Sequence, residues 1–253
     1  TVNSVNDAPT ISTITDKAIN EDTPSPAWPF TIGDVETPGT LTVTATSGNT
    51  TLITNPNVVL GGSGTDRTIQ VTPSTNAFGT AVITVNVSDG PNTTSTTFVV
   101  TVDAVNDLPT ISPIADQTVV EDTPTAALAF TVGDSETAPG TLTVSATSDN
   151  ILLVPVANIA FGGRGAARTV TVTPATHQFG EANITITVND GTGDATTTFK
   201  LTASAVNDAP VITAQTPVAT DEEQPVDIEL NHVTVTDPDN TYPDDFTLTV
   251  LAN

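Results

Sequence analysis

The chain has 253 residues, of which 29 are acidic and 5 are basic, so its formal net charge at pH 7 is −24. This charge disfavours nucleic acids and anionic membrane surfaces as partners and favours cations. The chain has no Cys, which excludes a disulfide-bonded domain, and no run of 18 apolar residues, so we expect no membrane insertion in this segment.

A phrase of eight residues occurs three times, as VNDAPTIS from Val5, VNDLPTIS from Val105 and VNDAPVIT from Val206. The period of 100 to 101 residues is that of a whole domain, because solenoid repeats are about 20 to 50 residues long. The first two copies are identical at about half of their positions. The predicted organisation is a linker over residues 1–7, complete repeats over 8–104 and 105–205, and an incomplete repeat over 206–253.

Short runs of alternating or β-branched residues, separated by Gly, Pro, Asn and Asp, fill the first repeat. They predict strands at residues 10–14, 28–33, 41–47, 57–62, 67–73, 81–89 and 94–102. The second repeat has a counterpart of each run, and no stretch shows the spacing of an amphipathic helix. Seven or so strands in about 95 residues predict an all-β fold of tandem Greek-key, Ig-like β-sandwich domains arranged end to end.

The third copy is expected to supply only the first strands of a sandwich, at residues 211–213, 227–230 and 246–250. The later strands that would cover their apolar faces are missing from these 253 residues. We therefore predict that this repeat cannot fold alone.

Acidic residues recur at fixed places in the repeats. Because consecutive strands run antiparallel, the loop after the first strand lies at the opposite end of the sandwich from the loop after the second. Stacked domains would then bring one end of the first repeat, the linker and the next repeat together. The candidate ligands at this first junction are Glu21, Asp103, Asn106, Asp107, Asp134, Glu136 and Asp190.

The second junction has fewer acidic residues, because Ser204 replaces the leading Asp of the linker. Its candidate ligands are Glu121, Asn207, Asp208, Asp237 and Asp239.

Carboxylates within about 4 to 6 Å of one another repel, and a hard divalent cation with about 6 to 8 oxygen ligands relieves that repulsion. Calcium is the expected cofactor, because magnesium demands tighter geometry and keeps its waters. With no Cys and two unrelated His residues, the sequence offers zinc or copper no ligands. For Asp22, Asp89 and Asp190 the alternative is a turn or a solvated loop.

The order of the acidic motifs along the chain resembles that of a known family of repeats. An acidic residue in the first loop, the D-x-x-N-D linker at residues 103–107, the D-x-E of Asp134 and Glu136 and a late Asp-Gly are similar to cadherin repeats. They are more similar still to the cadherin-like and Ig-like tandem repeats of large bacterial surface proteins, including RTX-type adhesins. The resemblance covers the whole chain and implies calcium at the junctions of a stiff extracellular stalk. It departs at residues 72–79, TPSTNAFG, and at residues 173–180, TPATHQFG, where cadherins have a further acidic pair. We therefore expect fewer or weaker ions than in a cadherin.

We therefore expect a structural or adhesive extracellular module, at the cell surface or secreted, with adjacent repeats of the same chain as its partners. The sequence shows no arrangement of side chains typical of a catalytic site, so we do not expect an enzyme. One alternative is a segment of an extracellular filament or sheath, joined to neighbouring copies in a fibre by strand donation. Another is an accessory domain of a secreted enzyme, although one Trp and one Tyr give little aromatic surface for a sugar.

Three smaller expectations concern single residues. Trp28 aligns with Leu128 and should be a core side chain. The GGSGTDR run that ends at Arg67 should be a turn between strands, and Arg67 and Arg168 should each pair with a carboxylate. His177 should be an exposed loop residue.

Overall fold

The computed structural model describes residues 5–36, 39–219, 221, 226–240 and 244–249. Its internal contacts divide the chain into two units. Unit 1 comprises Thr1–Pro109, Gly133–Leu142 and Asp190–Asp194, and unit 2 comprises Thr110–Val132, Thr143–Asn189 and Ala195–Asn253. Two loops of the second repeat thus belong to the same unit as the whole first repeat.

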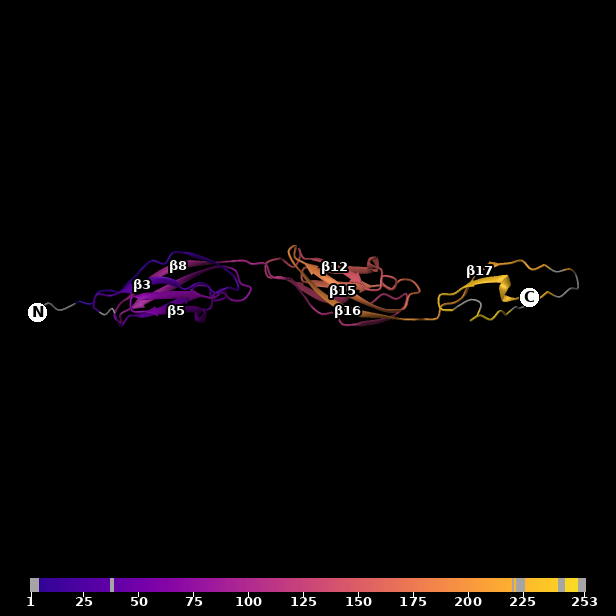
Figure 1. The fold of residues 1–253 in the computed structure, drawn as a ribbon, viewed down its shortest axis with the longest axis horizontal. Coiled ribbons are helices and arrows are strands. Elements are labelled where there is room, and N and C mark those ends of the chain that lie inside the picture. The colour runs from indigo at the N-terminus through magenta and orange to yellow at the C-terminus, as the bar shows by residue number, and fades with distance from the viewer. Residues whose placement is uncertain (1–4, 37–38, 220, 222–225, 241–243, 250–253) are drawn as a thin grey trace. The chain divides into compact units, whose positions relative to one another are not determined.

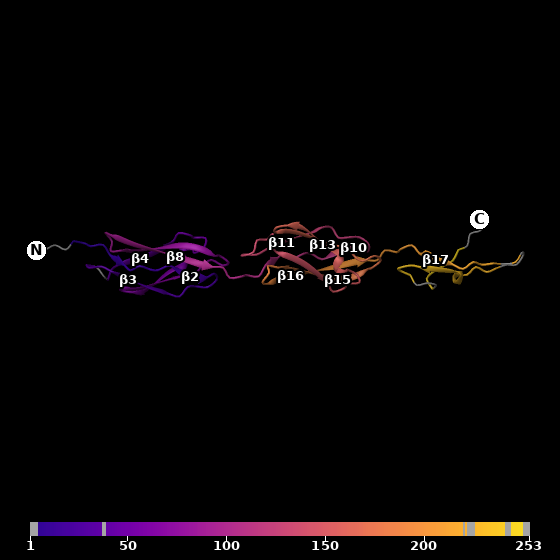
Figure 2. The same ribbon diagram turned by 90° about the horizontal axis from the view of Figure 1, so that it is seen from above.

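The first repeat is a two-sheet sandwich, which confirms the predicted all-β class (Figures 1 and 2). One sheet has the strand order β1-β3-β6-β5 and the other has the order β2-β8-β7-β4, so the chain passes repeatedly between the sheets in a Greek-key manner. The strands are β1 (Thr10–Ile11), β2 (Lys17–Asn20), β3 (Trp28–Gly33), β4 (Thr42–Ser47), β5 (Val58–Ser63), β6 (Asp66–Val71), β7 (Gly79–Ser88) and β8 (Thr93–Asp103).

The core lies between these two sheets. Along β7 every second side chain, from Ala81 to Val87, is buried, as expected for a strand with one face on the core. Trp28 is buried as predicted, and its ring meets the edge of Phe98 from the opposite sheet with a centroid distance of 6.0 Å. Burial of these apolar side chains is the main force that holds the sheets together.

Strand β2 was not predicted, and it matters for the site. It has only four residues and pairs in parallel with β8, from Lys17 opposite Val100 to Asn20 opposite Asp103. The backbone N–H of Glu21, just beyond β2, then donates to the Asp103 carbonyl at 3.0 Å. The pairing therefore fixes Glu21 beside the start of the linker.

The second repeat has the same topology, with the sheet orders β13-β14-β11-β9 and β10-β16-β15-β12. Its short strand β10 again pairs in parallel with β16. The strands are β9 (Thr110–Ile111), β10 (Gln117–Val120), β11 (Leu128–Gly133), β12 (Thr143–Ser148), β13 (Ile159–Arg164), β14 (Ala167–Val172), β15 (Gly180–Asn189) and β16 (Asp194–Ser204).

The third repeat differs from its prediction. Its described part contains β17 (Val211–Gln215) paired with β18 (Val233–Thr236), preceded by the turn η3 (Leu230–His232). The strands predicted at 227–230 and at 246–250 are wrong within the described residues, which end here at 249. The strand predicted at 246–250 corresponds to β4 of the first repeat and β12 of the second. These strands pair with β7 and β15, respectively, and the 253 residues contain no corresponding strand of the third repeat.

The remaining regular elements are η1 (Asn55–Asn57) and η2 (Val156–Asn158), each a single 3-10 turn. No helix among the described residues has the length and apolar character needed to cross a membrane.

The run that ends at Arg67 contains the turn between β5 and β6, at residues 64 and 65, as predicted. The predicted pairing of Arg67 with a carboxylate is wrong. Arg67 forms no ion pair among the described residues, and its Nε donates to the Gly64 carbonyl at 3.0 Å. Arg168 Nε donates likewise to the Gly165 carbonyl at 2.8 Å. Both side chains thus close the hairpin turn that precedes them.

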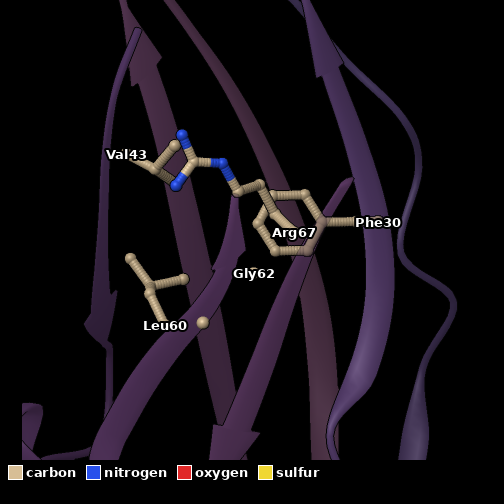
Figure 3. Close-up of a pocket in the computed structure, with 6 residues that line it drawn as sticks. Phe30, Val43, Leu60, Gly62 and Arg67 are labelled. Carbon is tan, nitrogen blue, oxygen red and sulfur yellow. The ribbon is translucent and has the colours of Figure 1, made fainter. Parts of the chain in front are cut away.

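Arg67 also lines a small hollow, with its guanidinium group directed toward Val43 (Figure 3). Phe30 and Leu60 form part of the same lining. The hollow holds about 80 Å³, whereas ligand sites for small molecules span roughly 300 to 1,000 Å³. It is therefore too small to be a substrate pocket.

Candidate metal centres

Glu21 is the most constrained carboxylate of unit 1. Only 2% of its surface is exposed, although glutamate is seldom fully buried without a partner. Its Oε1 accepts a hydrogen bond of 2.8 Å from the Val105 backbone N–H in the linker. Its Oε2 is buried and has no hydrogen-bond partner among the described residues. An ionised oxygen in that state costs free energy unless a cation compensates it.

The linker and the D-x-E loop supply two more carboxylates. The Asp107 backbone N–H donates to Glu136 Oε2 at 2.9 Å, which holds the linker against residues 133–142 of the same unit. Asp107 Oδ2 and Glu136 Oε1 are both buried without a hydrogen-bond partner in the described part of the chain. Carboxylate oxygens of Glu21, Asp107 and Glu136 lie within 4.8 Å of one another.

Asp134 lies in the same loop and shapes it. Its Oδ1 accepts hydrogen bonds from the Glu136 and Thr137 backbone N–H groups, at 3.0 and 2.6 Å. Its Oδ2 is buried and lacks a hydrogen-bond partner among the residues the structure describes. Asp134 therefore has one oxygen for the loop and one that remains for a ligand.

The other predicted residues of the first junction are not members of this three-carboxylate group. Asp103 is the exposed last residue of β8 and contributes its carbonyl to Glu21. Asn106 Nδ2 donates to the Asp107 carbonyl at 2.7 Å and to Asp190 Oδ2 at 3.0 Å. Asp190 Oδ1 accepts from the Gly193 and Thr192 N–H groups, and these bonds hold the pKa of Asp190 below its ordinary value. The turn alternative for Asp190 thus has direct support, whereas its role as a metal ligand stays a prediction.

Unit 2 contains a second group built on the same plan. Glu121 is 5% exposed, its Oε1 accepts from the Val206 N–H at 2.7 Å, and its Oε2 is buried without a hydrogen-bond partner in the described residues. The Asp208 N–H donates to Asp239 Oδ2 at 2.6 Å. Oxygens of Glu121, Asp208 and Asp239 lie within 4.8 Å of one another.

The two remaining candidates of this second group have supporting positions. Asp237 Oδ1 accepts from the Asp239 and Asn240 backbone N–H groups, both at 2.9 Å, in the manner of Asp134. Asn207 Nδ2 donates to the Asp208 carbonyl at 2.7 Å. Asp208 thus lies beside the acidic loop that follows the linker, and Asn207 contacts Asp208.

A third group was missed by the sequence argument. His177 Nδ1 lies 2.6 Å from Asp208 Oδ2 and 3.5 Å from Asp122 Oδ2, and ligand atoms of all three residues lie within 4.8 Å. His177 was expected to be an exposed loop residue, and 44% of its side chain is exposed. His177 aligns with Asn76 of the first repeat. That alignment does not predict its contact with the linker residue Asp208.

Unusual backbone conformations support these loops. Asp22, Asn76, Asp122 and His177 have φ angles between 52° and 59°, a region that non-glycine residues rarely adopt. In each repeat the Asp accepts a hydrogen bond from the loop residue opposite it, Asn76 N–H to Asp22 Oδ1 and His177 N–H to Asp122 Oδ1, both at 2.9 Å. Such conformations persist only where the surrounding structure fixes them, and they cluster at functional sites.

The chain is similar in sequence to one known family. Residues 106–202 match the family described as bacterial Ig domain, a stretch that covers most of the second repeat. Together with the fold, this match supports Ig-like or cadherin-like repeats. No curated protein matches the chain.

Solved structures show the same fold. The structure described as the protocadherin gammaB7 EC3-6 cis-dimer is 18% identical, with 93% of this chain and 57% of that chain covered and a TM-score of 0.52. Protocadherin Gamma B2 extracellular cadherin domains 1-5 are 17% identical, with 92% of this chain and 46% of that chain covered and a TM-score of 0.55. This chain therefore spans about half the length of these two structures, and at these identities the likeness concerns the fold alone.

An enzyme also appears among the similar structures. An endo-fucoidan hydrolase of glycoside hydrolase family 107 is 20% identical, with 79% of this chain and 29% of that chain covered. Its TM-score of 0.35 is too low to bear on function. Ig-like and cadherin-like repeats are typically structural domains without catalytic activity.

Proposed function

We propose that this chain is a segment of an extracellular structural or adhesive protein of a bacterial surface, and that calcium binds where one repeat meets the next linker. The observation that carries the proposal is the Oε2 atom of Glu21. It is a buried carboxylate oxygen with no hydrogen-bond partner among the described residues, in a side chain that is grouped with the carboxylates of Asp107 and Glu136.

Calcium fits this group for chemical reasons. Every candidate ligand atom in it is oxygen, and three clustered carboxylates carry more negative charge than a single divalent ion. Calcium accepts irregular shells of about 6 to 8 oxygens at 2.3 to 2.6 Å, so it tolerates ligands from separate loops. Asp134 and the backbone carbonyls of the linker could complete the shell.

The mechanical consequence follows from where the ligands lie in the chain. Glu21 belongs to the first repeat, Asp107 to the linker, and Glu136 to the second repeat. An ion that binds all three would couple these segments and reduce bending at the linker. A calcium-stiffened stalk is therefore the role we propose, with the adjacent repeats of the same chain as partners.

The test is calcium titration by calorimetry on the full chain, with Asp134→Ala as the disrupting variant. Asp34→Ala is the matched control. Asp34 has the same place in the D-x-E loop of the first repeat, but these 253 residues contain no earlier repeat whose Glu could share an ion with that loop. We expect Asp134→Ala to lose one bound calcium and Asp34→Ala to retain it. Equal calcium binding by wild type and Asp134→Ala, at equal affinity, would contradict the proposal.

A second candidate, strand addition into the third repeat, is favoured by one observation. Val211 and Ile212 are 57% and 53% exposed, and Ile212, Val235 and Phe246 line a hollow of about 190 Å³. Apolar strand residues left exposed in this way invite a further strand. Hydrogen exchange of β17 and β18 tests this: protection that rises with protein concentration supports donation by a neighbouring copy, and protection that is independent of concentration argues against it.

A further inference from the structure

The cluster of Asp122, His177 and Asp208 differs chemically from the all-oxygen groups. The His177 Nδ1 atom lies 2.6 Å from Asp208 Oδ2 and 3.5 Å from Asp122 Oδ2. One imidazole nitrogen and two carboxylate oxygens are a donor set suited to borderline divalent ions such as zinc, which calcium sites do not use. Three protein ligands would leave a coordination position open.

Glu121 connects this cluster to the second acidic group through Asp208. Its Oε2 is buried in a residue that is only 5% exposed, and it has no hydrogen-bond partner in the described part of the chain. A Glu121 oxygen lies within 4.8 Å of an Asp208 oxygen, so Asp208 belongs to both groups. A carboxylate with two oxygens can contact one cation on each side.

Access to the cluster is open. His177 and Asp208 line a surface hollow of about 460 Å³, together with Thr236 and Asp237. The side chains of Asp122 and His177 are 41% and 44% exposed. A hydrated metal ion can therefore reach the imidazole without opening the sandwich.

The first repeat supplies the comparison within the same chain. Asn76 occupies the place of His177, with nearly the same φ, 52° against 55°, and the same hydrogen bond to the preceding Asp. Asn76 Nδ2 donates instead to Ser135 Oγ at 3.0 Å. The backbone thus accepts either residue, and the difference between the repeats is the imidazole ligand.

We propose that Asp122, His177 and Asp208 form a transition-metal site for a zinc-like divalent ion, which shares Asp208 with the second acidic group. His177 Nδ1 and one oxygen from each Asp are the protein ligands, and water fills the open position. A bound ion would replace the direct contact between His177 and Asp208 and would hold the loop around His177 to the linker. The site does not depend on calcium at Glu21, because the two groups share no residue.

The experiment is zinc titration of the calcium-saturated full chain, followed by calorimetry and by NMR of the imidazole nitrogens. The chain has only two His residues, so the ring signals of His177 and His232 can be assigned from single variants. His177→Asn is the test variant, because Asn already occupies this conformation at residue 76. His232→Asn is the control, because it removes the other imidazole.

We expect one equivalent of zinc to shift the ring signals of His177 and leave those of His232 in place. His177→Asn should weaken zinc binding at least about tenfold, the loss typical of a damaged metal site, while His232→Asn binds as wild type does. The proposal is overturned if His177→Asn binds zinc as tightly as wild type, or if zinc leaves the His177 ring signals unchanged. The rise in the Tm of His177→Asn on addition of calcium tests calcium binding at the first junction independently of zinc binding.

Discussion

Replacing Glu21 with Gln should remove the stabilisation that calcium gives at the first junction and should stabilise the protein when calcium is absent. The substitution keeps the size of the side chain and the oxygen that accepts from the Val105 N–H, but it replaces the unpartnered Oε2 with an amide that cannot bind a cation. Without calcium the variant should be more stable than wild type, by about 1 to 3 kcal/mol, because a buried charge without a partner is removed.

With calcium the order should invert. An ion at about 100 times its dissociation constant adds ~2.7 kcal/mol to the free energy of unfolding of wild type. For a domain of this size, each kcal/mol shifts Tm by about 4 to 8 °C, so calcium should raise the Tm of wild type by about 10 to 20 °C. The variant should show little of this rise at the first junction.

Differential scanning calorimetry measures the Tm of wild type and of Glu21→Gln, each in calcium and in chelator. Glu181→Gln is the charge-matched control, because Glu181 is a surface residue whose carboxylate pairs with Lys200 at 2.9 Å, away from the acidic groups. That control should keep the full calcium shift. If Glu21→Gln keeps it too, then Glu21 is not a ligand and the reasoning from its burial is refuted.

Two further predictions concern stability. The backbone and side-chain N–H groups of Asn183 hold the pKa of Asp149 below its ordinary value of 3.8, so this carboxylate stabilises the fold above that pH and the contribution is lost as pH falls through the lowered pKa. Urea melts should therefore find Asp149→Asn less stable than wild type at neutral pH and equal to it in strong acid, and a constant difference would contradict this. Gly62 has φ +80° and a Cβ there would overlap the Asp66 carbonyl, so Gly62→Ala should destabilise the first repeat by about 1 to 3 kcal/mol, more than Gly64→Ala, where the space is open. Equal losses in thermal melts would show that the close approach at Gly62 does not matter.

Much of the fold was predictable because the strand residues alternate. Strand β3 was predicted at its observed bounds, and β4 to β8 within two residues. Strand β2 was missed because a four-residue edge strand carries almost no pattern, and its parallel partner β8 is distant in sequence. The third repeat was predicted by analogy with complete copies, and the analogy failed where strands depend on a later partner.

The site was predictable in outline only. The repeats, and the rule that successive loops lie at opposite ends of a sandwich, predicted that Glu21, Asp107 and Glu136 lie close together. Their carboxylate oxygens are close in the structure. Which oxygens are already used by turns, as in Asp190, depends on backbone geometry that no motif specifies. His177 was missed because its contact with Asp208 requires both a rare backbone conformation and the path of the linker.

The most direct test of calcium binding is a crystal structure of the chain grown in calcium. We predict an ion with Glu21 Oε2 and oxygens of Asp107 and Glu136 about 2.3 to 2.6 Å away. Well-ordered density in which these oxygens contact only water or protein N–H groups, in calcium-saturated crystals, would contradict it.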